Sequence, residues 1–143
     1  MMTMNEICKV VIIDDDYTAI EDLKKGLAVY SDMLIKGTAV NGAKGRKMIM
    51  EQRPDLLFLD IELPDMLGIR LLSDMREEVV WDMKVVFYTA YDKYLLQALR
   101  ESAFDYLLKP FTTEELDGII ERYRKAMVTH QVTPSFSASI AAL

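Results

Sequence analysis

Short apolar runs that alternate with helix-period segments constrain the fold of this chain more than any other feature. Each run is too short for a helix and consists mainly of residues that suit a buried strand. Strands that alternate with helices form parallel βαβ units with right-handed crossovers, so the pattern predicts a doubly wound α/β fold with a five-stranded parallel sheet. The five runs cover residues 9–13, 34–40, 55–60, 84–88 and 105–108.

Segments with apolar residues at helical spacing lie between these runs and after the last one. The second helix should end near Arg53, because the residue before Pro54 avoids the helical conformation. In the fourth helix, we expect Leu95, Leu96 and Leu99 on the inner face. The predicted helices cover residues 17–30, 41–53, 68–76, 92–101 and 112–127.

Composition fits one globular domain over residues 1–127, since 51% of the 143 residues are apolar. The net charge of −6 argues against direct binding of nucleic acid phosphates. The single cysteine, Cys8, excludes an internal disulfide, and we expect a small buried or half-buried thiol there. No stretch approaches the ~20 apolar residues of a membrane span, and no signal peptide pattern opens the chain, so we expect a cytoplasmic protein.

The segment 128–143 leaves the helical pattern, and its small polar residues predict a linker or the start of a truncated further domain. The only histidine, His130, lies in this segment, where we expect it to be solvated.

Charged and polar side chains stand where the predicted strands end. Asp14 and Asp15 follow the first strand, and Asp60 closes the third. Thr89 follows the fourth strand, and Lys109 follows the fifth. The carboxyl ends of parallel strands meet at one edge of a sheet, so these groups should converge on one crevice. Three carboxylates, a hydroxyl and an ammonium group suit a divalent cation and a phosphoryl group. Carboxylates at such short distances repel one another unless a cation neutralises them.

Four motifs follow one another along the chain, namely Ile12-Ile13-Asp14-Asp15, the segment from Leu59-Asp60 to Gly68, Tyr88-Thr89-Ala90 and Lys109-Pro110-Phe111. In this order they resemble the receiver domain of two-component response regulators over roughly residues 7–127. The resemblance implies a flavodoxin-like (βα)5 fold with strand order 2-1-3-4-5. Any single motif is weak evidence, whereas all four at domain-length spacing are specific.

The resemblance implies a role for each acidic position. Asp60 matches the aspartate that accepts a phosphoryl group from a phosphohistidine on a sensor histidine kinase. Asp14 and Asp15 match the acids that hold Mg²⁺, together with Asp60 and the backbone carbonyl of Glu62. The long Glu62 side chain beside the phosphoryl path either orients water or repels the phosphoryl group, which leaves the lifetime of the aspartyl phosphate open.

The resemblance also implies a conformational switch. Thr89 and Lys109 match the hydroxyl and the ammonium group that bind the phosphoryl oxygens, and the Lys109-Pro110 peptide of the family is often cis. Tyr106 matches the aromatic residue that changes rotamer when the threonine moves, and the small Ala90 leaves it room. The switch would favour a homodimer through the face from the fourth helix through the fifth strand to the fifth helix. Exposed candidates for this surface are Tyr91, Tyr94, Leu95 and Arg100.

Two segments look most similar to regulators whose output is a LytTR-type DNA-binding domain, namely Thr89 to Tyr94 and Phe104 to Pro110. The implied protein controls transcription and meets DNA only through an output domain beyond Leu143. It is not an enzyme with a separate substrate, but a switch that catalyses its own phosphorylation and dephosphorylation.

A second class is a haloacid-dehalogenase-like phosphohydrolase, because Asp14 and Asp16 also fit an Asp-x-Asp-x-Thr motif after a hydrophobic strand. Asp14 would then be the nucleophile and Asp16 the acid and base. The acidic metal motif that should follow the lysine is missing, and Asp60 would have no task. A third class, a pure interaction module with this fold, is disfavoured because Asp60, Thr89 and Lys109 are all present.

Overall fold

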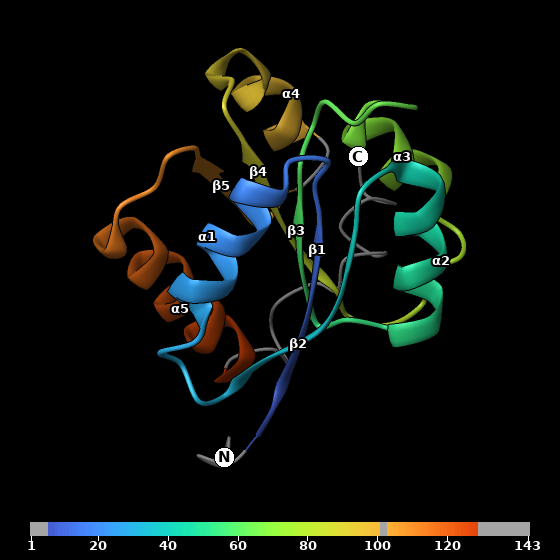
Figure 1. The fold of residues 1–143 in the computed structure, drawn as a ribbon. Helices are drawn as coiled ribbons and strands as arrows, with labels where there is room; N and C mark the ends of the chain where they lie inside the picture. Colours follow the sequence, from blue (N-terminus) through green and yellow to red (C-terminus); the bar gives the residue numbers. More distant parts are fainter. Residues whose placement is uncertain (1–5, 101–102, 129–143) are drawn as a thin grey trace.

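The computed structural model describes residues 6–100 and 103–128. Its strands form one parallel sheet with the order β2-β1-β3-β4-β5, which confirms the predicted fold (Figure 1). Apart from Val128, the segment 128–143 with His130 lies outside the described residues. The strands are β1 (Cys8–Ile13), β2 (Met33–Ala39), β3 (Leu56–Leu59), β4 (Lys84–Thr89) and β5 (Asp105–Leu108).

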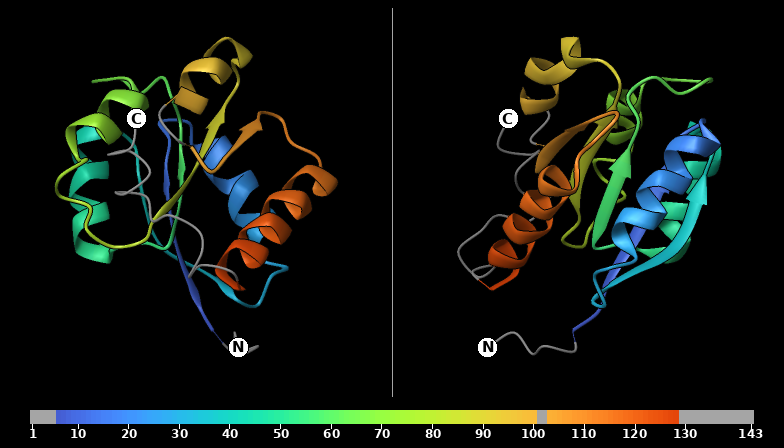
Figure 2. Two further views of the ribbon diagram at one scale, coloured as in Figure 1. Left: turned by 180° about the vertical axis from the view of Figure 1, so that it is seen from behind. Right: turned by 60° about the vertical axis from the view of Figure 1, so that its left-hand side comes forward.

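Helices cover both faces of the sheet (Figures 1 and 2). The helices α1 and α5 pack on one face, and α2, α3 and α4 pack on the other. None of these helices is long and apolar enough to cross a membrane. Their bounds are α1 (Tyr17–Leu27), α2 (Gly42–Gln52), α3 (Gly68–Asp74), α4 (Leu95–Arg100) and α5 (Thr113–Val128), and a 3₁₀ turn, η1 (Asp92–Tyr94), precedes α4.

Alternate residues of the central strands supply two separate cores. In β1, Val11 and Ile13 join the cluster beneath α2 and α3, whereas Val10 and Ile12 join the cluster beneath α1 and α5. All four side chains are fully buried. Successive strand residues point to opposite faces, so a strand covered on both sides must be apolar at every position. The continuous apolar runs of the sequence follow from this double burial, and Cys8 is buried as predicted.

Local signals at two helix ends act as predicted. Arg53 closes α2 in a left-handed conformation with φ 47°, and its backbone N–H donates to the carbonyl of Ile49. At the start of α5, the backbone N–H of Glu115 donates to the Thr112 hydroxyl over 3.1 Å, and the N–H of Thr112 donates to the Glu115 carboxylate over 3.0 Å. These reciprocal bonds form the expected capping box.

Two helix predictions are wrong in detail. Leu95 is 44% exposed, and among the described side chains of α4 Ala98 is the buried one at 1%. The 3₁₀ turn η1 has three residues per turn and occupies the first residues of the predicted helix, so one α-helical period does not extend over the whole segment. The side chains of Leu96 and Leu99 lie outside the described set. The first helix ends at Leu27 and not near residue 30; Tyr30 lies beyond it, and its hydroxyl donates a hydrogen bond to Asp117 of α5.

Candidate functional site

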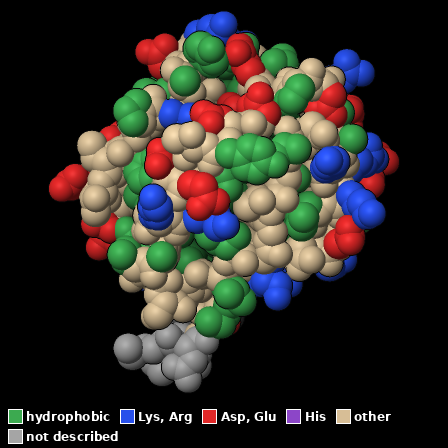
Figure 3. All heavy atoms as spheres, viewed as in Figure 1, with side chains coloured by type: hydrophobic (Ala, Val, Ile, Leu, Met, Phe, Trp, Pro, Cys, Tyr) green, Lys and Arg blue, Asp and Glu red, His purple; other side chains and the backbone are tan. Residues whose placement is uncertain are grey.

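The acidic cluster forms at the carboxyl edge of the sheet, as the strand order requires. Asp14 and Asp15 follow β1, and Asp60 follows the neighbouring strand β3. One carboxylate oxygen from each of the three lies within 4.8 Å of the others. Asp14 is fully buried and Asp60 is 6% exposed, whereas Asp15 faces solvent. In Figure 3, acidic side chains gather toward the upper part of the molecule, where these strands end in Figure 1.

Lys109 joins the cluster from β5. Its Nζ lies 2.6 Å from Oδ2 of Asp14 and 3.3 Å from Oδ2 of Asp60. The ammonium also lies 4.9 Å from the centre of the Tyr88 ring. The backbone N–H of Lys109 donates to the Thr89 carbonyl over 2.9 Å, and the Lys109-Pro110 peptide is cis. One cation therefore serves two buried carboxylates.

This arrangement perturbs the pKa of both Asp14 and Lys109. Burial raises the pKa of Asp14 to about 6, and the charge of Asp60 acts in the same direction. Hydrogen bonds from Lys109 and from the backbone of Asp16 oppose that shift. For Lys109, burial acts to lower the pKa, but the Asp14 and Asp60 carboxylates outweigh burial and raise it. The site thus holds more negative charge than one ammonium neutralises.

Asp16 caps helix α1 and is not part of the acidic cluster. Its carboxylate accepts a 2.9 Å hydrogen bond from the N–H of Thr18 and caps α1. Its own backbone N–H donates to Oδ1 of Asp14 over 2.9 Å, which fixes that carboxylate. A side chain that caps the first turn of a helix has a structural role. The acid and base role that the phosphohydrolase alternative assigned to Asp16 therefore finds no support in these contacts.

The loop after Asp60 is held close to the sheet. The N–H of Asp60 donates to the carbonyl of Ile13, and the N–H of Glu62 lies 3.4 Å from Oδ1 of Asp60. Gly68 donates to the carbonyl of Ile61 over 2.6 Å. A Cβ atom at Gly68 would lie 2.3 Å from the carbonyl oxygen of Asp60, so only glycine fits. This glycine sets the backbone that presents Asp60.

Asp65 has a contact that the sequence did not reveal. Its two carboxylate oxygens accept hydrogen bonds from the N–H groups of Gly42 over 2.7 Å and Ala43 over 2.9 Å. These bonds, led by the one from Gly42, lower the pKa of Asp65. The N-terminus of α2 is thus capped by the β3–α3 loop as well as by its own Asn41. No local pattern signals such a contact, because the two partners are far apart in sequence.

Thr89 and Tyr106 occupy the strands beside the cluster. Thr89 is the last residue of β4 and is fully buried, and its Oγ1 has no hydrogen bond partner among the described residues. A buried hydroxyl without a partner is costly, which points to a ligand that supplies one. Ala90 follows at an exposed position. Tyr106 is half-buried, and its hydroxyl donates to the backbone carbonyl of Tyr91.

The Glu62 side chain has partners of its own. Its Oε2 accepts a 2.5 Å hydrogen bond from the Tyr94 hydroxyl and lies 3.6 Å from Nζ of Lys93. The bond to the carboxylate raises the pKa of the Tyr94 hydroxyl. Sequence reasoning placed Glu62 beside the phosphoryl path but found neither partner, since both contacts join segments that are distant along the chain.

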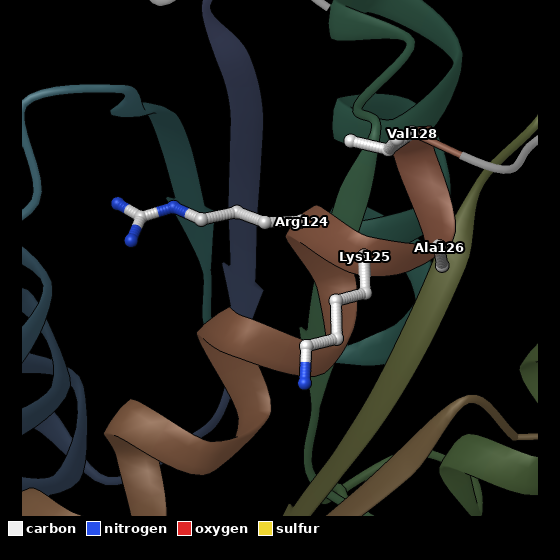
Figure 4. A pocket seen from close by; sticks show the side chains of 4 residues that line it. All are labelled: Arg124, Lys125, Ala126 and Val128. Carbon is white, nitrogen blue, oxygen red and sulfur yellow. The ribbon is translucent and has the colours of Figure 1, made fainter.

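A pocket of about 480 Å³ lies elsewhere, at the C-terminal end of α5. Figure 4 shows that its side chains do not converge on a common point. Because α5 runs back along the sheet from the end of β5, this pocket is at the opposite edge from the aspartates. It contributes nothing to the acidic site. The lining residues are Arg124, Lys125, Ala126 and Val128.

Comparison with known proteins gives one family. The model of the response regulator receiver domain matches residues 10–121. An uncharacterised response regulatory protein of Vibrio cholerae is 45% identical over 112 residues, which cover 78% of this chain and 46% of that protein. The transcriptional regulatory protein BtsR of Escherichia coli is 38% identical over 117 residues, which cover 82% of this chain and 48% of that protein. The chain therefore spans about half the length of these curated relatives.

Solved structures agree with the family match. The response regulatory domain of mrkE from Klebsiella pneumoniae has a TM-score of 0.75 and 28% identity, and the match covers 82% of this chain and 96% of that one. The REC domain of AraT from Geobacillus stearothermophilus has a TM-score of 0.79 and 26% identity, and the match covers 87% and 98%. Both likenesses extend over nearly the whole of the solved domain.

Receiver domains are phosphoacceptor switches that interact with histidine kinases and bind Mg²⁺ at an acidic pocket, and this chain has such a cluster of aspartates. The phosphohydrolase alternative is not supported by any of these comparisons. On the match over residues 10–121, together with the parallel sheet that carries the cluster, the chain belongs to the family of response regulator receiver domains.

Proposed function

We propose that Asp60 of this chain accepts a phosphoryl group from the phosphohistidine of a sensor histidine kinase. The observation that carries the proposal is the placement of Asp60 beside the Lys109 ammonium, whose Nζ lies 3.3 Å from Asp60 and 2.6 Å from the buried neighbouring acid Asp14. The orphaned hydroxyl of Thr89 at the same edge of the sheet offers a donor for a phosphoryl oxygen.

Mg²⁺ fits the donor set of this site. Asp14, Asp15, Asp60 and the backbone carbonyl of Glu62 are the residues that would hold it. Mg²⁺ prefers oxygen ligands and keeps several waters, so a few carboxylates suffice. Bound there, the cation neutralises carboxylate and phosphoryl charge, for which the single ammonium of Lys109 is not enough.

The residues of the chain hold the acceptor in position. A carboxylate oxygen of Asp60 forms the new bond to phosphorus as the phosphorus–nitrogen bond of the phosphohistidine breaks. The backbone N–H of Glu62 and the Lys109 ammonium orient that carboxylate. Lys109 then pairs with a phosphoryl oxygen, and the Thr89 hydroxyl donates to another. Phosphoryl transfer depends mainly on such positioning and charge compensation, so the domain catalyses its own phosphorylation and its own dephosphorylation by water.

Labelling by a small phosphoryl donor tests the acceptor. Acetyl phosphate with Mg²⁺ should add one phosphoryl group to the intact chain, as measured by mass spectrometry. Asp60→Asn should abolish the added mass, because an amide does not act as the nucleophile. If Asp60→Asn still accepts the group while Asp14→Asn does not, Asp14 is the nucleophile and the proposal fails.

The switch couples Asp60 to the face formed by α4, β5 and α5. The phosphorylated Asp60 draws the Thr89 hydroxyl toward the phosphoryl group. Tyr106 then gives up its hydrogen bond to the Tyr91 carbonyl and adopts a more buried rotamer. The outer face already exposes apolar surface, since Tyr91 is 47% exposed and Leu95 is 44% exposed. A homodimer through this face buries that surface.

Sedimentation with and without beryllofluoride, a mimic of the phosphoryl group, measures the dimer constant. Allosteric couplings of ~1–3 kcal/mol correspond to a shift of roughly 5- to 150-fold. An unchanged dimer constant contradicts the switch for this domain.

The output belongs to a part of the protein that this chain does not include. Residues 1–127 act as the receiver domain, and residues 128–143 form a linker or the start of an output domain. The segments Thr89 to Tyr94 and Phe104 to Pro110 support a LytTR-type transcriptional regulator in the cytoplasm, which meets DNA only through that domain. The native reading frame beyond Leu143 tests this directly. A domain without the basic, β-rich character of such a DNA-binding module contradicts the assignment.

A further inference from the structure

The Glu62 carboxylate is held by two neighbouring residues of the η1 turn. Its Oε2 accepts the 2.5 Å hydrogen bond from Tyr94 and lies 3.6 Å from Nζ of Lys93. The same Nζ lies 5.1 Å from the ring centre of Tyr91 and 5.2 Å from that of Tyr94. A lysine between two aromatic faces is restrained by their quadrupoles. Glu62 therefore has a hydrogen bond donor in the half-buried Tyr94 and a nearby countercharge in Lys93, whose side chain is 63% exposed.

These contacts keep the Glu62 carboxylate out of the acidic cluster. Among the described residues, the group of carboxylates that share a site consists of Asp14, Asp15 and Asp60 and does not include Glu62. Its backbone is nevertheless close to the acceptor, because the N–H of Glu62 lies 3.4 Å from Oδ1 of Asp60. A glutamate side chain is long and has three rotatable bonds, so a released carboxylate can swing toward Asp60. The contacts with Tyr94 and Lys93 prevent that movement.

We propose that Tyr94 and Lys93 form a latch on Glu62 that keeps its negative charge away from the phosphoryl donor as it approaches Asp60. The latch makes Tyr94 a positioning residue for the phosphorylation reaction, since it acts through Glu62 and not on the reacting atoms. This inference rests on the proposed role of Asp60 as the acceptor.

The latch also joins the two segments that the switch involves. Glu62 belongs to the loop after β3, whereas Tyr94 belongs to the turn between Thr89 and α4. The same turn is held at a second point by the hydrogen bond from Tyr106 to the carbonyl of Tyr91. Any movement of this turn that separates Tyr94 from Glu62 therefore changes the charge near Asp60. When the turn moves away, the released Glu62 carboxylate would repel a further phosphoryl donor.

Tyr94→Phe tests the latch because it removes only the hydroxyl that binds Glu62. The measurement is the initial rate of phosphorylation of the whole chain by acetyl phosphate at saturating Mg²⁺, followed by intact mass. A carboxylate released to roughly 6 Å from a doubly charged donor in water slows the reaction about three- to tenfold. The matched control is Tyr17→Phe, which removes the hydroxyl of a tyrosine that is 72% exposed at the start of α1, and should react at the wild-type rate.

A second substitution separates the released charge from general damage. Glu62→Gln keeps the backbone and the length of the side chain but removes the charge. In the Glu62→Gln background, Tyr94→Phe should no longer slow the reaction, so the double variant recovers the rate lost in Tyr94→Phe. Lys93→Gln leaves the hydrogen bond in place and should slow the reaction less than Tyr94→Phe does. A merely structural role of Tyr94 does not produce recovery when Glu62 is neutralised.

Two results overturn the latch. One is a wild-type rate for Tyr94→Phe. The other is a double variant as slow as Tyr94→Phe, because slowing that persists without the charge comes from a displaced turn. Failure of the acceptor assignment looks different. In that case Asp60→Asn accepts the phosphoryl group as readily as the wild-type chain does, whatever residue stands at position 94.

Discussion

Replacement of Lys109 by methionine should destabilise the domain, and Mg²⁺ should reverse much of the loss. The Nζ of Lys109 is 2.6 Å from the Asp14 carboxylate and 3.3 Å from that of Asp60. The Asp14 side chain is 0% exposed, that of Asp60 is 9% exposed and that of Lys109 is 16% exposed. Methionine keeps the length and volume of the lysine stem, so the substitution removes mainly the charge. The two buried carboxylates then have no cation.

Loss of one partner from a buried ion pair costs about 3–5 kcal/mol. Asp14 limits that cost, because burial has already raised its pKa to about 6 and it can take up a proton. We therefore expect a loss near ~2 kcal/mol at neutral pH without Mg²⁺, or roughly 8 °C in the melting temperature of a domain of this size. Loss of the Lys109 ammonium removes a group that lowers the pKa of Asp14, so Asp14 in the variant takes up a proton above pH 6. The loss should therefore shrink as the pH falls from neutrality toward about 6, since protonated Asp14 needs no cation.

Thermal unfolding can be followed by the fluorescence of Trp81, the only tryptophan, whose indole N–H donates to the carbonyl of Pro54 in the folded domain. Mg²⁺ should raise the melting temperature of Lys109→Met more than that of the wild-type chain, because the cation replaces a charge that the variant lacks. Lys25→Met, at an exposed position of α1, is the control and should unfold like the wild type. If Lys109→Met also melts at the wild-type temperature and gains no more from Mg²⁺, the two carboxylates do not depend on Lys109 and the electrostatic account is wrong.

Three further predictions follow from contacts at the site and elsewhere in the domain. Gly68→Ala should destabilise the domain by ~1–3 kcal/mol in chemical unfolding, because its Cβ would lie 2.3 Å from the carbonyl oxygen of Asp60; wild-type stability would show that the loop yields without cost. Asp32→Asn should cost about 1 kcal/mol at neutral pH through the bidentate pair with Arg124. Since Arg124 lowers the pKa of Asp32, this difference should be complete above pH ~4 and vanish as the pH falls through the lowered pKa; a difference that persists in acid argues against the ion pair. Thr89→Ala should still accept a phosphoryl group but shrink the beryllofluoride-induced shift in dimerisation, and a full shift would remove Thr89 from the switch.

Most of the fold was predictable because double burial makes a strand apolar at every position. Capping signals are equally local, so the Thr112–Glu115 box and the end of α2 at Arg53 appeared as expected. The exposure of Leu95 was not predictable from periodicity, because the pattern that placed Leu95 on the inner face also runs over the 3₁₀ turn η1. A helix-period pattern does not distinguish such a turn from the first turn of an α-helix.

Some contacts of the candidate site were likewise predictable from the sequence, and others were not. The proximity of Asp14, Asp60 and Lys109 was predictable from the sequence, because the strand order of a parallel sheet sets which strand ends are neighbours. The hydrogen bond partners of Glu62 and Asp65 were not predictable from the sequence. Each of these contacts joins segments whose relative position depends on side-chain packing along the carboxyl edge of the sheet.

The central claim is that Asp60, and no other carboxylate, carries the phosphoryl group. Reaction with acetyl phosphate and Mg²⁺, reduction of the acyl phosphate by borohydride, and peptide mapping would identify the modified residue directly, since reduction converts a phosphorylated aspartate into homoserine. We predict homoserine at position 60 alone. Homoserine at position 14, or at none of the aspartates in a chain that still binds Mg²⁺, would contradict the account.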